Sequence, residues 1–175
     1  MKLTDIFLRE KPTLSFEVFP PKRDTDYQSV KGAVDAIAAL SPDFMSVTYG
    51  AGGGTSALTA QLAESIGRRG VTALAHLTCV SSSREEVQGQ LALLREGGIE
   101  NILALRGDLP EGRSLDDTMH YRYAAQLVEE IREFGGFSIG AACYPEGHVD
   151  APSQGEDLKR LKEKVDCGCD FLVTQ

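Results

Sequence analysis

A glutamate and a charged tripeptide are the first candidates for chemistry in this sequence. Glu17 lies between Phe16 and Val18, shortly before two prolines. A carboxyl group in an apolar cavity loses water, which raises its pKa toward the working pH and suits it to general acid catalysis. A structural role is the alternative, in which a basic residue such as Arg106 forms an ion pair with Glu17. The sequence leaves both interpretations open.

Two further charged groups could bind a polar ligand. Arg106 and Asp108 flank Gly107, an arrangement that suits binding the polar edge of a small molecule. Asp157 and Lys164 are seven residues apart, so two helical turns would place them on one face of a helix. An ordinary solvated helix face is the alternative for this second pair.

The spacing of histidine and cysteine does not indicate a metal centre. The histidines at positions 76, 120 and 148 have no H-x-x-x-H spacing. Of the four cysteines, at 79, 143, 167 and 169, the last two form a C-x-C without a second pair at zinc-site spacing. Because the N-terminus has no export signal, we expect four free and mostly buried thiols instead of two disulfides.

A glycine loop at residues 47–56 (VTYGAGGGTS) could approach a phosphate. It is typical of a strand end followed by a helix start, with Thr55 or Ser56 as the N-cap. Its backbone N–H groups could bind a phosphate, but it lacks the lysine of a P-loop and the G-x-G-x-x-G pattern. A tight turn is the alternative.

Six apolar segments determine where these side chains can lie. They predict strands at 14–19, 43–49, 71–79, 99–106, 137–144 and 170–175. Segments with helical spacing lie between them, with apolar faces at Val30, Val34, Ile37 and Leu40, at Val87, Leu91 and Leu94, at Leu127, Val128 and Ile131, and at Leu158, Leu161 and Val165. Ser153 and Glu156 predict a capping box for the last helix, and Gly168 predicts its end. Alternating strands and helices predict parallel βαβ units.

The length of the repeat predicts the fold class. Each βαβ unit takes about 31 residues, so eight units would need roughly 250 residues, the usual size of a (β/α)8 TIM barrel. We therefore expect an α/β fold that is an incomplete TIM barrel, with about six strands and five helices, in a chain truncated at its C-terminus.

Strand parity predicts a binding site at one end of this barrel. Successive strand residues point to opposite faces, and one face collects polar groups near the carboxyl ends of the strands. That face holds Glu17, Ser46, Thr48, His76, Thr78, Tyr144 and Gln175, and in the fourth strand Ile102, Ala104 and Arg106, with Asp108 continuing the row. Barrel active sites lie at this end. The alternative to a binding site is a set of polar residues at the rim that only form hydrogen bonds with one another.

Composition excludes several classes of protein. The chain has 175 residues, is 42% hydrophobic and carries a net charge of −8. Such acidity disfavours nucleic-acid binding. Neither a membrane-spanning run nor a signal peptide is evident, so we expect a cytoplasmic protein without a membrane segment.

Six long motifs follow one another along the chain: FEVFPPK (16–22), VTYGAGG (47–53), HLTC (76–79), NILALRGDLP (101–110), AACYPEGH (141–148) and DLKRLKEKVDCGCDFLVTQ (157–175). From about residue 14 to the end, they resemble the methylenetetrahydrofolate reductase family, the flavin-dependent barrel enzymes of one-carbon metabolism. The resemblance implies that residues 1–175 are a single domain, the N-terminal two thirds of a flavin-binding TIM barrel.

The resemblance also implies roles for individual residues. Glu17 would be the general acid that opens the methylene bridge of the folate, Asp108 would contact flavin and pterin, and Gln175 would meet folate and nicotinamide in turn. The positions that match FAD-binding residues are Thr48, Tyr49, Ala51, His76, Arg106, Gly107, Asp108, Tyr123, Ala124, Tyr144, His148, Ala151, Asp157 and Lys164. Arg160 departs from the uncharged polar residue expected there.

The implied activity is the FAD-dependent reduction of methylenetetrahydrofolate to methyltetrahydrofolate with NADH or NADPH, in one-carbon and methionine metabolism. A homo-oligomer is implied as well. Two alternatives remain at this point: another barrel enzyme that binds a pterin or flavin, and a truncated barrel without catalytic activity that serves as an interaction subunit.

Overall fold

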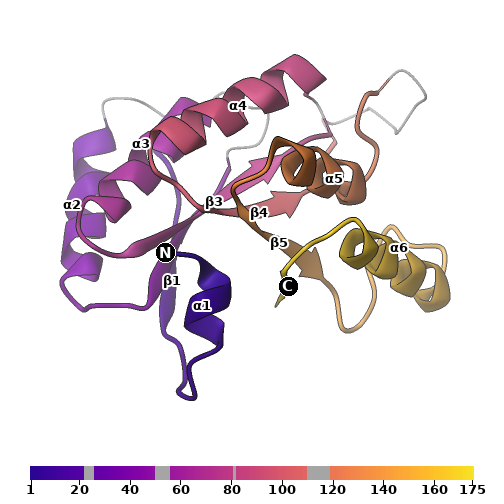
Figure 1. Cartoon of the computed structure of the whole chain (residues 1–175), viewed down its shortest axis with the longest axis horizontal. Coiled ribbons are helices and arrows are strands. Elements are labelled where there is room, and N and C mark those ends of the chain that lie inside the picture. Colours follow the sequence, from indigo (N-terminus) through magenta and orange to yellow (C-terminus); the bar gives the residue numbers. More distant parts are fainter. Residues whose placement is uncertain (22–25, 50–55, 81, 110–118) are drawn as a thin grey trace.

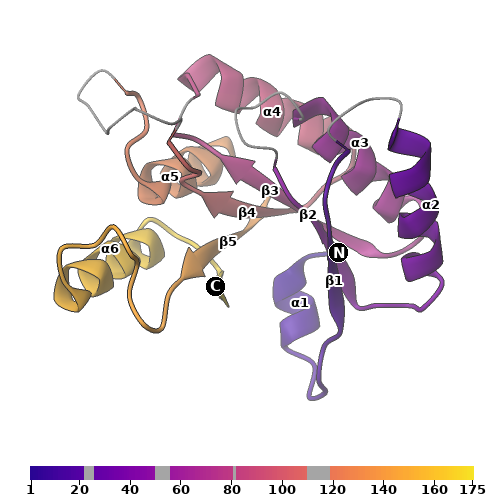
Figure 2. The ribbon, with the colours of Figure 1, turned by 180° about the vertical axis from the view of Figure 1, so that it is seen from behind.

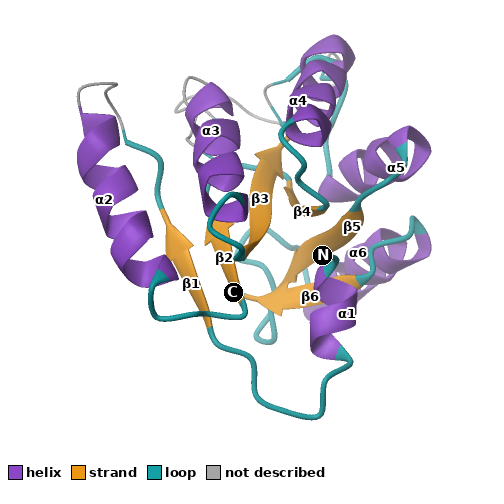
Figure 3. Cartoon of the chain, turned by 60° about the vertical axis from the view of Figure 1, so that its left-hand side comes forward, coloured by secondary structure: helices purple, strands orange, loops and turns teal. Residues whose placement is uncertain are grey.

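The fold is an open, curved sheet of six parallel strands with helices on its convex side (Figure 1, Figure 3). The computed structural model describes residues 1–21, 26–49, 56–80, 82–109 and 119–175. The strands follow one another in the order β1 (Ser15–Val18), β2 (Phe44–Val47), β3 (Thr72–Thr78), β4 (Asn101–Leu105), β5 (Ser138–Cys143) and β6 (Phe171–Thr174). The prediction of six strands in an incomplete barrel is confirmed.

Five helices connect the strands and a sixth precedes them. They are α1 (Leu3–Phe7), α2 (Tyr27–Ala38), α3 (Ser56–Gly67), α4 (Arg84–Glu96), α5 (Ala124–Phe134) and α6 (Gln154–Asp166). The apolar faces predicted for α4 and α5 are buried. In α6 the predicted face is not, since Leu158 is 59% exposed and Val165 is 45% exposed. Leu40, expected on the apolar face of α2, follows that helix and is exposed.

Helix caps differ in part from the prediction. The Ser153 hydroxyl accepts a hydrogen bond from the Glu156 N–H (3.2 Å), as expected for an N-cap. The Glu156 carboxylate, however, pairs with Lys159 and Arg160, so the predicted capping box is only half formed. A complete capping box lies at the start of α4, where Ser83 and Glu86 bond each other's backbone N–H groups.

Two apolar layers fix the strand faces. The larger lies between the sheet and the helices, and it includes Met45, Val47 and Ala75. The smaller lies on the concave side, where Leu74 and Leu103 pack with partly buried Phe171. Because these concave residues share a face with Glu17, Ser46 and His76, the polar groups of β1 to β3 lie on the predicted face.

In β4 the predicted parity is wrong. Leu103 and Leu105 lie on the concave side, whereas Ile102 and Ala104 belong to the helix-side core. The sequence of this strand, NILAL, is apolar at four of five positions, so it has no polar alternation to reveal its orientation. Arg106 and Asp108 follow the end of the strand, where the alternation no longer applies.

Helix α1, which the sequence did not predict, closes the end of the barrel that holds the strand N-termini. Its Leu3 and Ile6 are buried in the concave layer, on the side of the sheet opposite α3 and α4 (Figure 2). Buried Asn101 accepts a hydrogen bond from the Leu3 N–H (2.7 Å) and donates to the carbonyls of Met1 and Ala73 (3.0 Å each). One amide therefore joins the N-terminus, β3 and β4.

We expect Asn101→Ala to lower the free energy of unfolding by about 2–3 kcal/mol, because it leaves buried backbone groups without partners. Urea unfolding measures this loss. Ser138→Ala is the matched control: Ser138 pairs with Asn101 in the sheet register, is equally buried, and its hydroxyl has no hydrogen-bond partner among the described residues. Equal losses in the two variants would contradict the role given to Asn101.

Candidate functional site

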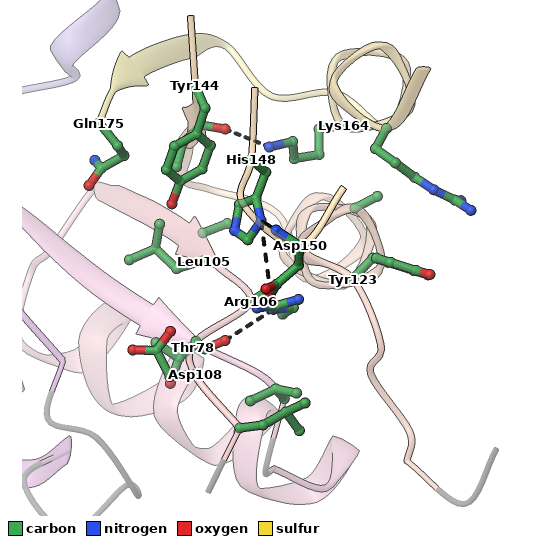
Figure 4. A pocket seen from close by; sticks show the side chains of 18 of the residues that line it. Thr78, Leu105, Arg106, Asp108, Tyr123, Tyr144, His148, Asp150, Lys164 and Gln175 are labelled. Carbon is green, nitrogen blue, oxygen red and sulfur yellow. Dashed lines mark hydrogen bonds and ion pairs between the residues drawn. The ribbon is translucent and has the colours of Figure 1, made fainter. Parts of the chain in front are cut away.

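A large pocket lies at the carboxyl ends of β3, β4 and β5 and against the starts of α5 and α6 (Figure 4). Its volume is about 1360 Å³. Twelve of the sixteen predicted site residues line it: Tyr49, Arg106, Gly107, Asp108, Tyr123, Ala124, Tyr144, His148, Ala151, Asp157, Lys164 and Gln175. Positions far apart in the sequence thus meet around one cavity.

Three of the remaining predicted residues, Glu17, Thr48 and His76, do not line this pocket. Ala51 lies outside the described residues, as does most of the glycine loop. The backbone of Thr48 links the end of β2 to its neighbours. Its N–H donates a hydrogen bond to the Val18 carbonyl, and its carbonyl accepts one from the Thr59 hydroxyl in α3 (3.0 Å each). Glu17 and His76 lie together on the concave face of the sheet.

Glu17 has polar neighbours on the next two strands. One of its carboxylate oxygens, Oε2, lies 3.4 Å from the Ser46 hydroxyl and 3.4 Å from Nε2 of His76. The Glu17 side chain is 48% exposed. The alternative pairing with Arg106 is not found, because Arg106 forms its ion pair with Asp150.

His76 is neutral at neutral pH. Its imidazole is buried on the concave face, and this loss of water lowers its pKa to about 4. The contact between His76 and Glu17 is therefore not an ion pair near pH 7. A neutral imidazole can position a carboxyl group without fixing it in the charged form.

The lowered pKa of His76 predicts a loss of stability in acid. The unfolded chain takes up this proton near pH 6.5 and the folded chain only near pH 4, so stability falls as the pH falls between these values, by about 3 kcal/mol in total. Urea unfolding at pH 7 and pH 4 should show that His76→Gln removes this part of the loss. The same substitution at exposed His120 should retain the loss seen in the unaltered protein.

Backbone geometry positions Arg106, Gly107 and Asp108. The Arg106 carbonyl accepts hydrogen bonds from the N–H groups of Cys79 (3.1 Å) and Val80 (2.8 Å). Gly107 has φ of +84°, and a Cβ there would lie 2.9 Å from that of Thr78. The end of β3 therefore requires glycine at this position and places the charged side chains on either side of it.

The loop between β5 and α6 forms one wall of the pocket. The rings of Tyr144 and His148 pack edge to face, with centroids 4.7 Å apart. The His148 N–H donates to the Asp157 carboxylate (3.3 Å). The Asp150 carboxylate pairs with Arg106 at 3.0 Å, which joins this loop to the end of β4.

Lys164 adds a desolvated cation to the same wall. Its ammonium group donates to the Ala142 carbonyl at the end of β5. Burial lowers its pKa, and the nearby Asp157 carboxylate opposes this change. Asp157 and Lys164 are thus brought to one site, as their spacing on the predicted helix indicated.

Sequence reasoning missed Asp150 and set Arg160 aside, although both line the pocket. The Arg160 guanidinium lies over the ring of Tyr123, 4.5 Å from its centroid, and pairs with Glu163 (3.0 Å). The only available signal for Arg160 was its position one turn after Asp157. The signal for Asp150 was weaker still, because a charge two residues after His148 does not indicate that its partner is Arg106, 44 positions away.

The structure also bears on the predictions about thiols, metal centres and membrane segments. All four thiols are free, but only Cys79 is fully buried and the other three are half-buried. Within the described ranges no three metal-ligating side chains come together. Among the helices of the described chain, none has the length and apolar character to span a bilayer.

Comparison with known proteins supports one family. The family model for methylenetetrahydrofolate reductase matches residues 2–175. The chain is 40% identical over 169 residues to 5,10-methylenetetrahydrofolate reductase of Pectobacterium carotovorum, and 39% identical over 163 residues to that of Escherichia coli. It is 38% identical over 180 residues to methylenetetrahydrofolate reductase (NADH) 1 of Zea mays.

Coverage differs between the chains compared. The alignments cover 96%, 93% and 94% of this chain, but 55%, 54% and 30% of the respective relatives. The chain thus spans about half the length of its bacterial relatives.

Solved structures share the fold at low identity. A 2,3-dimethylmalate lyase has a TM-score of 0.68 at 12% identity, covering 99% of this chain and 62% of the lyase. QR15, an aldolase, has a TM-score of 0.62 at 12% identity, covering 96% and 70%. These likenesses concern the barrel alone, whereas the family model extends over nearly every residue. The chain belongs to the methylenetetrahydrofolate reductase family.

Proposed function

We propose that this chain forms the flavin-binding part of an enzyme that reduces methylenetetrahydrofolate to methyltetrahydrofolate with FAD and NADH. One observation supports this proposal most: twelve residues that the family resemblance assigns to cofactor and substrate, spread from Tyr49 to Gln175, surround a single pocket. In a member of this family, such convergence favours a binding site over a scattered set of rim residues.

The pocket is large enough for a dinucleotide and has cations among its lining residues. Its volume of about 1360 Å³ exceeds the range of roughly 300–1,000 Å³ that is usual for drug-sized ligands. Arg106 and Lys164 supply cations for a diphosphate, and the Tyr144 ring offers a flat apolar surface. When bound, the flavin supplies the hydride chemistry, while the protein binds and orients it.

We infer that Glu17 donates the proton that opens the methylene bridge of the folate. Its half-exposed carboxyl group faces the concave side of the sheet, with the Ser46 hydroxyl and the neutral His76 imidazole next to it. These two neighbours orient the carboxyl group. Asp108 and Gln175 line the pocket and would hold the pterin near the bound flavin.

NADH is the donor we propose, because the maize relative is named for it. That residues 1–175 are a single domain, that the enzyme is cytoplasmic and that it forms a homo-oligomer remain predictions. The family match argues against the alternative of another barrel enzyme that binds a pterin or flavin.

A turnover assay separates the proposed function from a barrel without activity. The assay uses the full-length protein that contains these residues, with FAD, NADH and methylenetetrahydrofolate. We expect one methyltetrahydrofolate to form for each NADH that is oxidised. NADH oxidation without the folate product would contradict the proposed substrate. Neither reaction, in a folded protein that retains FAD, would favour the interaction subunit.

A further inference from the structure

The ion pair between Arg106 and Asp150 involves a pocket residue to which the predicted site gives no role. A guanidinium nitrogen of Arg106 lies 3.0 Å from Oδ2 of Asp150, while Nε donates to the Gly107 carbonyl. The Arg106 side chain is 22% exposed and that of Asp150 is 62% exposed. Figure 4 shows Asp150 beside both His148 and Arg106. A carboxylate of the protein thus holds a cation of the proposed diphosphate site.

A turn in the backbone presents Asp150 to Arg106. The Asp150 N–H donates to Nδ1 of His148 (3.1 Å), and the Ala151 N–H donates to the His148 carbonyl (2.9 Å). The hydrogen bond from Arg106 lowers the pKa of Asp150, so this carboxylate is charged near pH 7.

The loop that carries Asp150 has little of its surface buried. Val149 is 94% exposed, and Glu146 and Asp150 are exposed as well. The side chain of Asp150 can therefore leave Arg106 for solvent without opening the apolar core.

We propose that Asp150 is an internal competitor for the diphosphate of a nucleotide cofactor: its carboxylate holds Arg106 in the ligand-free protein, and a phosphate oxygen replaces it when the cofactor binds. Carboxylate and phosphate oxygens accept hydrogen bonds from the same guanidinium donors. Two anions beside one cation repel each other, so binding of the phosphate releases the carboxylate. The exchange rests on the proposed function of the pocket and assigns Asp150 a part in setting cofactor affinity.

The test compares Asp150→Asn with Glu146→Gln by calorimetric titration of FAD, inorganic pyrophosphate and riboflavin. Both substitutions remove one negative charge from the same exposed loop, but only the first removes the competitor. We expect Asp150→Asn to bind FAD and pyrophosphate about fivefold more tightly than the unaltered protein does. This factor corresponds to the loss of one exposed ion pair at the upper end of the usual range of strength. Glu146→Gln should stay within about twofold of the unaltered protein, as should both variants with riboflavin, which lacks phosphate.

Three results would overturn the exchange. They are equal affinities for Asp150→Asn and Glu146→Gln, weaker binding by Asp150→Asn, and an equal gain with riboflavin. Asp150→Ser should repeat the gain, so a folding defect of one variant does not decide the outcome. Pyrophosphate separates this proposal from the proposed function: a gain with pyrophosphate in a protein that binds no FAD would support the exchange and contradict the flavin site.

Discussion

Replacing Glu17 with Gln should abolish most folate reduction while leaving the reduction of FAD by NADH intact. The amide keeps the size of the side chain and its contacts with Ser46 and His76, but it cannot donate the proton that opens the methylene bridge. Loss of a general acid costs about 10²- to 10⁴-fold in rate. Stopped-flow absorbance separates the two half-reactions, because flavin reduction and reoxidation by folate are followed independently.

Glu10→Gln is the control for this prediction. Glu10 is exposed in the segment after α1, so its replacement removes the same charge without touching the concave face. The control should retain both half-reactions. Folate reduction at the normal rate in Glu17→Gln would refute the role of Glu17, whereas a slow first half-reaction would show that Glu17 acts on the flavin site instead.

Gly107→Ala should weaken FAD binding by at least about tenfold, the effect of displacing one charge-assisted contact. The new methyl group would lie 2.9 Å from Cβ of Thr78, and φ of +84° is unfavourable for alanine. Relieving this overlap must move the segment that positions Arg106 and Asp108. Overpacking and backbone strain together should also lower the free energy of unfolding by about 2–5 kcal/mol.

Gly98→Ala separates strain from displacement of the site. Gly98 has a similar φ of +73°, but no atom lies within 4 Å of the position of its added Cβ. This variant should lose about 1–2 kcal/mol of stability through strain alone and should bind FAD normally. Flavin fluorescence quenching and urea unfolding measure the two quantities. Equal FAD affinity in both variants would contradict the positioning role of Gly107.

The six strands could be predicted because each is a short apolar run bounded by turns and helical spacing. The orientation of β1 to β3 also followed from sequence, since polar Glu17, Ser46 and His76 alternate with apolar neighbours. In β4, four of the five residues are apolar and residues on both faces are buried, so only the packing of Leu103 against Leu74 reveals its orientation. Helix α1 has five residues and is held by Asn101, a contact across about a hundred positions that no local pattern contains.

The site was predictable to the extent that residues could be matched to long family motifs. Tyr144, His148 and Lys164 lie in such motifs and line the pocket. The partner of Arg106 was not predictable, because nothing in the local sequence indicates that Asp150 folds back onto the end of β4. Pairings of this kind depend on the curvature of the sheet, which brings the loops of neighbouring strands together.

The measurement that tests the central claim most directly is the visible absorbance spectrum of the purified 175-residue chain after incubation with FAD and gel filtration. We predict a flavin band that elutes with the protein, because the strands, loops and helices that line the pocket all belong to this chain. Addition of NADH to the pooled fraction should then bleach the band. A folded protein that elutes without flavin would contradict the claim that this pocket holds the cofactor.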